Sequence, residues 1–300
     1  MLGVVVVTHN SDAVLGACLE SCRKFANAPV LVVDNASSDQ SVIVAQQAGV
    51  MVCANAENRG FAAAVNQGVT QLGTDLILLL NPDAELLSPV EPLVLACSDP
   101  GTGASAGALV DAETHLPQQG FSVRRFPTAT TLVFETLGLN RLFPWNPVNR
   151  RYRCTGLNLA NATLIEQPAA AFFLFRRDAW ADVGGFDESF DPIWFEDVDF
   201  CKRLANREWK IRYIPEATAA HRGGHSALQL ESYQKRSYWF ASLLRYARKH
   251  CSATGFRVVC GSVLLRSLLD GGKPSRPAHI QPKVLSPARL ALKGLKTGKI

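Results

Sequence analysis

The chain has 300 residues, of which 47% are hydrophobic and 19% are charged, and this is enough to bury one large core or two fused ones. Such a composition excludes an intrinsically disordered chain. The formal net charge is +5, but residues 271–300 carry seven Lys or Arg and no acid, which leaves −2 for residues 1–270. The body of the protein is therefore close to neutral, and we expect no nucleic-acid partner.

The basic tail formed by residues 271–300 has several interpretations that stay open. It is a solvated terminus, a nucleic-acid arm, or a segment attracted to an anionic membrane surface at about 1 kcal/mol per basic residue. Prolines divide it, and 288–299 is predicted as a small basic helix. No window reaches the roughly 18 apolar residues of a membrane span, and the N-terminus resembles a strand more than a secretory signal. We expect a cytoplasmic protein whose tail can contact the inner face of the cell membrane.

Strands and helices alternate along the first part of the chain. Runs of Val, Ile and Leu without polar alternation predict strands buried on both faces, and apolar residues every three or four positions predict helices. The predicted strands are 4–7, 30–33, 50–54 and 76–80, and the predicted helices between them are 12–25, 40–47 and 61–72. This order indicates an α/β fold with a Rossmann-like, mostly parallel sheet flanked by helices.

The pattern is less regular after residue 105. The sequence predicts strands at 106–110 and 172–175, helices at 178–183, 198–207 and 229–250, and a functional or mobile loop rich in Pro, Asn and Arg at 140–155. We expect one domain of residues 1–226, divided into a nucleotide-binding half (1–105) and an acceptor and catalytic half (106–226). A C-terminal helical region with the basic tail (227–300) follows it.

Three polar residues, Thr8, Asp34 and Asp83, stand at or just beyond the ends of predicted strands. Because right-handed crossovers bring parallel strands to the same edge, we expect these residues at the carboxyl edge, where open α/β sheets bind ligands. Asp34, with Asn35 beside it, is placed to accept hydrogen bonds from a base or ribose, and a helix cap explains it equally well. The first strand lacks a following Gly-x-Gly-x-x-Gly, which disfavours a dehydrogenase.

An acidic segment, Asn81-Pro82-Asp83-Ala84-Glu85, follows the apolar run at 76–80. Its two carboxylates, Asp83 and Glu85, offer hard oxygen ligands to Mg²⁺ or Mn²⁺, and a diphosphate can complete the coordination shell. Acidic pairs are common in surface loops, but the position of this pair after a buried strand favours a metal site. His221 is a candidate third ligand, although a lone histidine is more often structural.

A second acidic cluster, Glu196-Asp197-Val198-Asp199, follows two aromatic residues. Nearby like charges raise the proton affinity of a carboxylate, so Asp197 is a candidate general base. The alternative is a helix N-terminus enriched in acids, with Lys202 and Arg203 as partners one turn further on.

These motifs together resemble family 2 glycosyltransferases with the GT-A fold, and in particular the bacterial rhamnosyltransferase-like branch. The resemblance extends from about Val4 to Ser226. It depends on six motifs in order: Thr8-His9-Asn10, Asp34-Asn35-Ala36-Ser37, Asn58-Arg59-Gly60-Phe61, Asn81-Pro82-Asp83, Gly184-Gly185-Phe186-Asp187-Glu188 and Phe195-Glu196-Asp197-Val198-Asp199. Where relatives usually have Gly-Ala, this chain has Ala169-Ala170-Ala171, so its acceptor specificity is an open question.

The resemblance implies a role for each motif. The Thr8 and Asp34 positions hold the nucleoside, Asp83 with Glu85 carries the metal, and His221 often completes the metal site. The Asp197 position deprotonates the acceptor hydroxyl, which attacks the donor directly with inversion at the anomeric carbon. The predicted donor-binding set is Thr8, His9, Asn10, Asp34, Asn35, Arg59, Asn81 and Asp83.

We therefore predict an inverting, metal-dependent glycosyltransferase that uses a dTDP- or UDP-sugar, with rhamnose as the candidate sugar. Its predicted acceptor is a hydroxyl of a cell-surface polysaccharide or of a lipid-linked precursor. Two alternatives stay open. A nucleotidyltransferase should have a Gly-rich basic loop after the first strand, and Thr8–Leu15 is not one; a non-catalytic nucleotide- or carbohydrate-binding subunit would not need the retained acidic residues.

Overall fold

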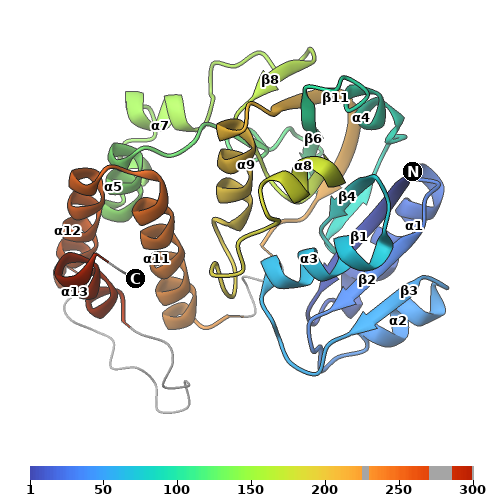
Figure 1. Ribbon diagram of the computed structural model, residues 1–300, viewed down its shortest axis with the longest axis horizontal. Coiled ribbons are helices and arrows are strands. Elements are labelled where there is room, and N and C mark those ends of the chain that lie inside the picture. The colour runs from blue at the N-terminus through green and yellow to red at the C-terminus, as the bar shows by residue number, and fades with distance from the viewer. Residues whose placement is uncertain (225–229, 270–285, 299–300) are drawn as a thin grey trace.

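Four short apolar strands form a parallel half-sheet, because a helix after each of the first three returns the chain so that the next strand runs in the same direction. The computed structural model of the protein describes residues 1–224, 230–269 and 286–298 (Figure 1). The strand order in this half is β3-β2-β1-β4. The strands are β1 (Leu2–Thr8), β2 (Val30–Asp34), β3 (Met51–Ala54) and β4 (Leu76–Leu80), and the helices are α1 (Asp12–Phe25), α2 (Ser41–Gln47) and α3 (Phe61–Leu72). The sequence predicted all seven elements.

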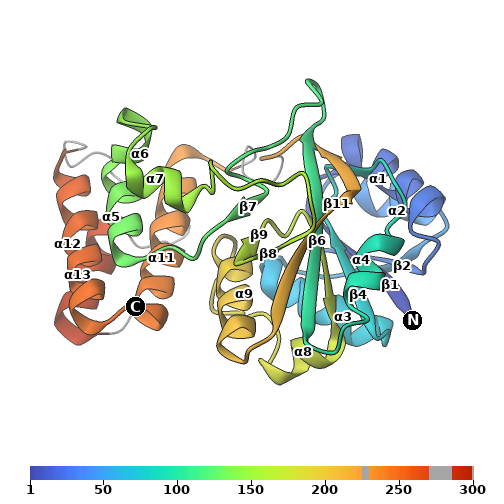
Figure 2. The same ribbon diagram turned by 90° about the horizontal axis from the view of Figure 1, so that it is seen from above.

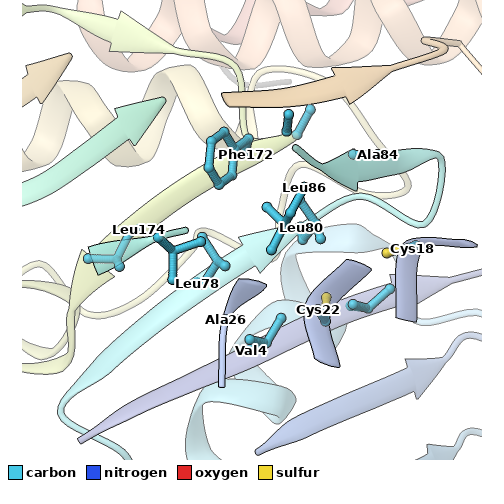
Figure 3. Packing of buried hydrophobic residues seen from close by; sticks show 14 of the residues in the cluster. Val4, Cys18, Cys22, Ala26, Leu78, Leu80, Ala84, Leu86, Phe172 and Leu174 are labelled. Atoms are coloured by element: carbon cyan, nitrogen blue, oxygen red, sulfur yellow. The ribbon is translucent and has the colours of Figure 1, made fainter. Parts of the chain in front are cut away.

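Successive residues of β1 point to opposite faces of the sheet, and each face is covered by a different helix. Val4 and Val6 pack in one core with Cys18 and Cys22 of α1, as Figure 3 shows for Val4 and the two cysteines. Val5 and Val7 pack in a second core with the alanine-rich face of α3. Burial of each such aliphatic side chain contributes about 1.5–3 kcal/mol, so both helices are held by the sheet.

The second half of the sheet is mixed. Strand β10 (Phe172–Arg176) runs antiparallel to both β4 and β6 (Thr102–Asp111), and β11 (Lys210–His221) runs parallel to β6. Two short strands, β5 (Ala84–Leu86) and β8 (Thr163–Ile165), pair antiparallel with β11. The predicted strands at 106–110 and 172–175 lie inside β6 and β10, whereas β11, β5 and β8 were not predicted. Because β5 follows β4 after a short turn and pairs with β11, the residues just after β4 lie beside the end of β11, with Ala84 opposite His221.

Shorter elements surround this half of the sheet. The prediction of a loop at 140–155 is wrong in part, because this segment contains most of the short helix α6 (Leu139–Leu142) and all of the helix α7 (Pro147–Tyr152). Asn146 caps α7 by accepting a hydrogen bond from the Asn149 backbone, and Pro147 occupies the first turn, where its missing N–H costs nothing. The elements are α4 (Glu91–Ala96), α6 (Leu139–Leu142), α7 (Pro147–Tyr152), α8 (Arg177–Asp182), α9 (Glu196–Asn206) and a two-stranded sheet of β7 (Val123–Arg124) and β9 (Gln167–Pro168).

A helical layer lies beside the sheet and has its own core. It combines α5 (Ala129–Leu137) with α11 (Ser232–His250), α12 (Ala253–Leu269) and α13 (Pro287–Thr297), and Figures 1 and 2 show these helices grouped together. Its apolar core includes Phe190 and Val198 from the sheet domain, which join the two parts. The layer therefore uses residues from before and after the predicted boundary at 226, a position that itself lies outside the described residues.

Two predictions concern the C-terminal helices. The predicted helix at 229–250 corresponds to α11, and the one at 288–299 to α13, whereas α12 was not predicted. Among the described helices, none is both long and apolar enough to cross a membrane.

Candidate active site

A cleft of about 370 Å³ lies at the carboxyl edge of the sheet, between the sheet and the helical layer. The parallel register places Thr8 opposite Asp34 and Val6 opposite Leu80, so the loops after β1, β2 and β4 meet there. The N-terminus of α9 and the end of β11 enter from the opposite side. Predicted site residues that line the cleft are Thr8, His9, Asn35, Asn81, Asp83, Asp197 and His221.

Two loops that border the cleft are connected by hydrogen bonds. The Asp34 carboxylate accepts hydrogen bonds from the Ser37 backbone at 2.9 Å and from the Ser37 hydroxyl at 2.5 Å. The Asn10 backbone donates to the same hydroxyl at 2.8 Å, and the Asn10 side chain accepts from the Ser38 backbone at 2.7 Å. Asp34 and Asn10 therefore shape the loops after β2 and β1. Neither of them lines the cleft.

Asn35 connects this loop to the start of α3. Its amide donates to the Gly60 carbonyl at 3.0 Å and accepts from the Arg59 backbone at 3.3 Å. His9 Nδ1 lies 2.9 Å from the Asn35 carbonyl oxygen. The side chain of Arg59 is exposed and outside the lining of the cleft. The predicted donor-binding set thus divides into residues that line the cleft and residues that position them.

His221, the last residue of β11, is buried beside Asp83, and its Nε2 lies 3.5 Å from Asp83 Oδ1. Gln118 determines the tautomer of this histidine. Its amide nitrogen donates to the His221 carbonyl at 2.7 Å, so its amide oxygen is the group 3.1 Å from Nδ1, and Nδ1 carries the proton. In the neutral imidazole the lone pair of Nε2 then faces the carboxylate of Asp83. Phe121 stacks on the imidazole with the ring planes 16° apart.

Glu85 does not share this position. It lies in β5 opposite Ala220 and outside the lining of the cleft, whereas Asn81, two residues before Asp83, lines it. No cluster of three or more His, Cys, Asp or Glu side chains suited to a metal ion occurs in the described part of the chain.

The start of α9 holds the buried carboxyl group of Glu196 and the half-buried one of Asp197. Trp194 and Phe195 both have left-handed backbones, with φ of 78° and 69°, and this strained turn directs the chain into the helix. Burial raises the pKa of Asp197. Burial, together with the charge of the adjacent Asp197, raises the pKa of Glu196 well above its usual range. The Asp197 carboxylate accepts a hydrogen bond from the Val198 backbone at 2.8 Å.

The third acid of this cluster, Asp199, has a structural role. It is ion-paired with Arg203 at 2.7 Å and with Lys249 at 2.8 Å, and it contacts His250 at 2.7 Å. Although burial alone would raise its pKa, these partners hold the pKa of Asp199 below its usual value. The cause of the raised pKa of Asp197 is thus burial, and Asp199 instead connects α9 to α11.

Unsatisfied polar atoms concentrate in the cleft. Among the described residues, seven buried side-chain nitrogen or oxygen atoms have no hydrogen-bond partner, and four of these belong to residues that line the cleft. Those four atoms are Thr8 Oγ1, Gln167 Oε1, Glu196 Oε2 and His221 Nε2. Native proteins rarely bury such atoms without a partner, so this concentration indicates a ligand site.

Comparison with known proteins identifies the family. The family model described as Glycosyl transferase family 2 matches residues 3–180. The chain belongs to glycosyltransferase family 2. It is 27% identical over 314 residues to an N-acetylglucosaminyl-diphospho-decaprenol L-rhamnosyltransferase of Mycobacterium tuberculosis (strain CDC 1551 / Oshkosh), covering 89% of this chain and 95% of that one. The predicted resemblance to the rhamnosyltransferase-like branch is confirmed. The protein is a glycosyltransferase, which decides against both the nucleotidyltransferase and the non-catalytic subunit.

Two solved structures share the fold of this family 2 glycosyltransferase. A structure of GalNAc-T7 with UDP, GalNAc and Mn²⁺ superposes with a TM-score of 0.57 at 15% identity, over 74% of this chain and 43% of the other. The mannosyltransferase PcManGT from Pyrobaculum calidifontis, with GDP-Man and Mn²⁺, gives 0.53 at 14% identity, over 100% and 88%. At these identities the comparison establishes the GT-A fold, as predicted.

Several cleft residues of this family 2 chain escaped sequence reasoning. Phe121 and Gln167 line the cleft, and Gln118 contacts His221 from outside the lining. All three lie in irregular segments or short strands without a local motif, so only tertiary pairing brings them to the site. Glu196 was visible as an acid, but only the structure shows that it is buried and faces the cleft. The partial alternation of apolar and polar residues at 210–221 was the one signal in the sequence that could have predicted β11, the strand that carries His221.

Proposed function

We propose that this enzyme transfers a sugar from a dTDP- or UDP-sugar to a hydroxyl of a lipid-linked or cell-surface glycan, with inversion and with the help of Mg²⁺ or Mn²⁺. L-Rhamnose is the candidate sugar, since it is named for the mycobacterial relative. The observation that carries the proposal is a single cleft that contains both the buried Asp83–His221 pair and the half-buried carboxyl of Asp197, whose pKa is raised by burial.

The chemistry of the donor atoms fits a divalent cation. Two hydrogen-bond acceptors, His221 Nε2 and Asp83 Oδ1, face each other at 3.5 Å, and they repel each other unless a proton or a cation lies between them. Asn81 lines the cleft and is the candidate third ligand in place of Glu85. When bound, Mg²⁺ or Mn²⁺ would supply Lewis-acid stabilisation of the charge that develops on the departing diphosphate.

Asp197 is the proposed general base. A raised pKa makes a carboxylate a stronger proton acceptor, and exclusion of water from its surroundings favours direct transfer from the acceptor hydroxyl. Burial and the charge of Asp197 raise the pKa of Glu196, and Glu196 is the more deeply buried of the two, so we propose that Glu196 retains its proton while Asp197 ionises. Asp197 therefore faces no second negative charge from its neighbour. The acceptor oxygen bonds to the anomeric carbon, the bond to the diphosphate breaks, and the proton passes to Asp197.

The donor nucleoside is placed at the ends of β1 and β2. Thr8 Oγ1 lacks a partner among the described groups and is available to a ribose or base, and Asn35 lines the same end of the cleft. Asp34 and Asn10 act as positioning residues, because their hydrogen bonds fix the loops that carry Asn35 and His9.

Replacement of Asp197 by Asn tests the proposal. We expect transfer to fall by about 10²–10⁴, the usual contribution of a general base, while the thermal shift given by a nucleoside diphosphate with Mn²⁺ stays at the wild-type value. A ligand at one hundred times its dissociation constant stabilises by about 2.7 kcal/mol, so a panel of dTDP, UDP and GDP also identifies the nucleotide. Glu91→Gln, on the exposed side of α4, is the control. Wild-type transfer by a folded Asp197→Asn enzyme would exclude Asp197 as the base.

A further inference from the structure

The two-stranded sheet of β7 and β9 forms part of the cleft wall, and neither strand carries a residue of the proposed metal site, nucleoside site or base. Arg124 of β7 pairs directly opposite Gln167 of β9, and both side chains line the cleft. Figure 2 shows the two strands between the main sheet and the helical layer. The three alanines at 169–171 follow β9 and continue the same lining. This wall is the part of the cleft that can contact an acceptor bound at Asp197.

Gln167 presents a buried hydrogen-bond acceptor to the cleft. The residue is 3% exposed, and its amide nitrogen donates to the Pro168 carbonyl at 2.8 Å and to Asp197 Oδ2 at 3.4 Å. Because a carbonyl oxygen can only accept, the first contact fixes which end of the amide is nitrogen. The amide oxygen, Oε1, has no hydrogen-bond partner among the described residues. A ligand that satisfies this buried oxygen must therefore donate a hydrogen bond to it.

Arg124 presents hydrogen-bond donors beside this acceptor. Its guanidinium lies over the rings of Phe121 and Tyr152, with Cζ 5.6 and 5.7 Å from the ring centroids, and its Nε donates to the Gly120 carbonyl at 2.8 Å. These contacts hold the planar group in one orientation. Within the described part of the chain, no hydrogen bond uses its Nη1 or Nη2. The N–H bonds of these two atoms are available to an oxygen of a ligand.

Both side chains are close to the proposed base. Burial raises the pKa of Asp197, whereas the positive charge of Arg124 lowers it, so the two charges interact. Gln167 contacts the same carboxylate through its amide nitrogen. A ligand hydroxyl that gives its proton to Asp197 therefore has an unpaired acceptor and unpaired donors beside it.

The combination of an acceptor and a cation restricts the chemistry of the group that binds next to the attacking hydroxyl. An ammonium group would satisfy Gln167 but would be repelled by Arg124. A carboxylate or phosphate would pair with Arg124 but would leave Gln167 Oε1 unsatisfied, which costs free energy in a buried site. A hydroxyl both donates and accepts, so a second hydroxyl satisfies Gln167 and Arg124 together.

We propose that Gln167 and Arg124 recognise a free hydroxyl of the acceptor sugar on the carbon next to the one that carries the attacking hydroxyl. The acceptor is then a sugar with two neighbouring free hydroxyls. Asp197 takes the proton of one, while Gln167 Oε1 accepts a hydrogen bond from the other and Arg124 donates to its oxygen. The inference rests on the proposed function and adds to it the residues that select the acceptor.

Binding of methyl glycosides to the full chain tests the proposal. The probes are the methyl glycosides of glucose, galactose, mannose and N-acetylglucosamine. They are titrated by saturation-transfer NMR while Mn²⁺ and the nucleoside diphosphate that gives the largest thermal shift fill the donor site. We expect at least one glycoside to bind, and one of its monodeoxy analogues to bind about tenfold more weakly, because that analogue lacks the hydroxyl that satisfies Gln167.

Three variants assign this preference to the two side chains. Gln167→Met replaces the amide with an apolar chain of similar length, and the preference for the parent glycoside over that analogue should disappear, a change that loss of packing alone does not produce. Arg124→Gln removes donors from a half-buried side chain and should weaken binding of the parent glycoside about tenfold. Arg125→Gln is the matched control. Arg125 lies outside the lining and pairs with Glu166 at the surface, so its loss should change binding by less than about twofold.

Several results overturn the proposal. An unchanged preference in Gln167→Met would show that Gln167 does not contact the discriminating hydroxyl, and equal weakening by Arg124→Gln and Arg125→Gln would reveal only a general effect of charge. Melting temperatures show whether each variant is folded, and Arg124→Gln supplies the test if Gln167→Met does not fold. Binding of the nucleoside diphosphate without binding of any glycoside would contradict the acceptor subsite and leave the transferase proposal standing. Absence of nucleoside diphosphate binding would contradict the transferase proposal itself.

Discussion

The two sides of the cleft that we propose to hold the donor and the acceptor, called here the donor side and the acceptor side, are built in different ways. On the donor side, the loops after β1 and β2 satisfy one another's polar groups through Asn10, Asp34 and Ser37. On the acceptor side, Glu196 is buried and Asp197 is half-buried at the start of α9, both have raised pKa values, and Glu196 Oε2 lacks a partner. The first side is preorganised by hydrogen bonds, whereas the second retains an energetic cost that catalysis can use.

Asp83 and His221, the pair that we propose to hold the metal, lie between the two sides of the cleft. Loss of the charge of this pair should have the largest effect on sugar transfer. In Asp83→Asn the carboxylate that faces His221 loses its charge, so we expect transfer to fall about 10³-fold, which corresponds to several kcal/mol of Lewis-acid stabilisation. Differential scanning fluorimetry should show that Mn²⁺ no longer increases the shift given by the nucleoside diphosphate. An unchanged Mn²⁺ response would place the ion elsewhere.

Gln118 tests whether His221 needs its positioning partner. Gln118→Ala removes the acceptor for Nδ1 and the donor to the His221 carbonyl, so the imidazole can change tautomer or rotate. We expect Mn²⁺ affinity, measured by titration in the presence of nucleotide, to fall about 10- to 100-fold, while nucleotide binding without metal is retained. Gln119→Ala is the matched control, since Gln119 is exposed and outside the cleft lining. Equal loss in both variants would argue for a general loop effect.

The energetic cost on the acceptor side should appear as a pH dependence of stability. Burial raises the pKa of Glu196 in the folded protein, so the folded state binds this proton more tightly than the unfolded chain does. The stability from this group is complete below the unfolded pKa of about 4.3 and is lost as the pH rises through the raised folded value. Because the side chain of Gln does not titrate, Glu196→Gln removes this loss of stability at high pH.

Thermal melts at two pH values measure that effect. We expect the melting temperature of Glu196→Gln to exceed that of the wild type by about 2 °C more at pH 8 than at pH 5. The exposed Glu91→Gln should show no such difference. A variant that follows the wild-type curve at every pH would mean that the pKa of Glu196 is not raised in the folded protein.

The donor loops should give the smallest change. Ser37→Ala removes the hydroxyl that links Asp34 to the Asn10 backbone, and we expect a loss of about 1 kcal/mol in the free energy of unfolding, with donor affinity reduced only a few-fold. Ser38→Ala, whose hydroxyl makes one longer contact of 3.2 Å with Asn10, should cost less. Chemical denaturation measures both, and the reverse order would show that the two loops are not joined through Ser37.

The sequence was sufficient for the donor half of the fold. Its strands are continuous apolar runs and its helices repeat at helical spacing, so local patterns alone located β1 to β4 and α1 to α3 within a residue or two. The same argument placed Thr8 and Asp34 at one edge, because parallel strands must end together. The motif with Asp197 was also visible, since it begins a helix directly after two aromatic residues.

Other parts needed the tertiary structure. Strand β11 was missed because its alternation is weak and its partners, β6, β5 and β8, are far away in sequence. For the same reason no local signal brought Gln118 to His221, a separation of 103 residues. Glu85 was expected at the metal because it follows Asp83 by two positions, but its pairing with Ala220 in β5 leaves it outside the cleft lining, while Asn81 lines it.

The amino-acid sequence by itself determined the family, the parallel half-sheet and the identity of the acids, because these follow from local periodicity and from short ordered motifs. Only the tertiary structure decided which acids face the cleft, which tautomer His221 adopts, and that Arg124 and Gln167 meet in the cleft wall. The physical reason is that burial and pairing of charge depend on what packs around a group, and for these residues the surroundings come from elements far away along the chain.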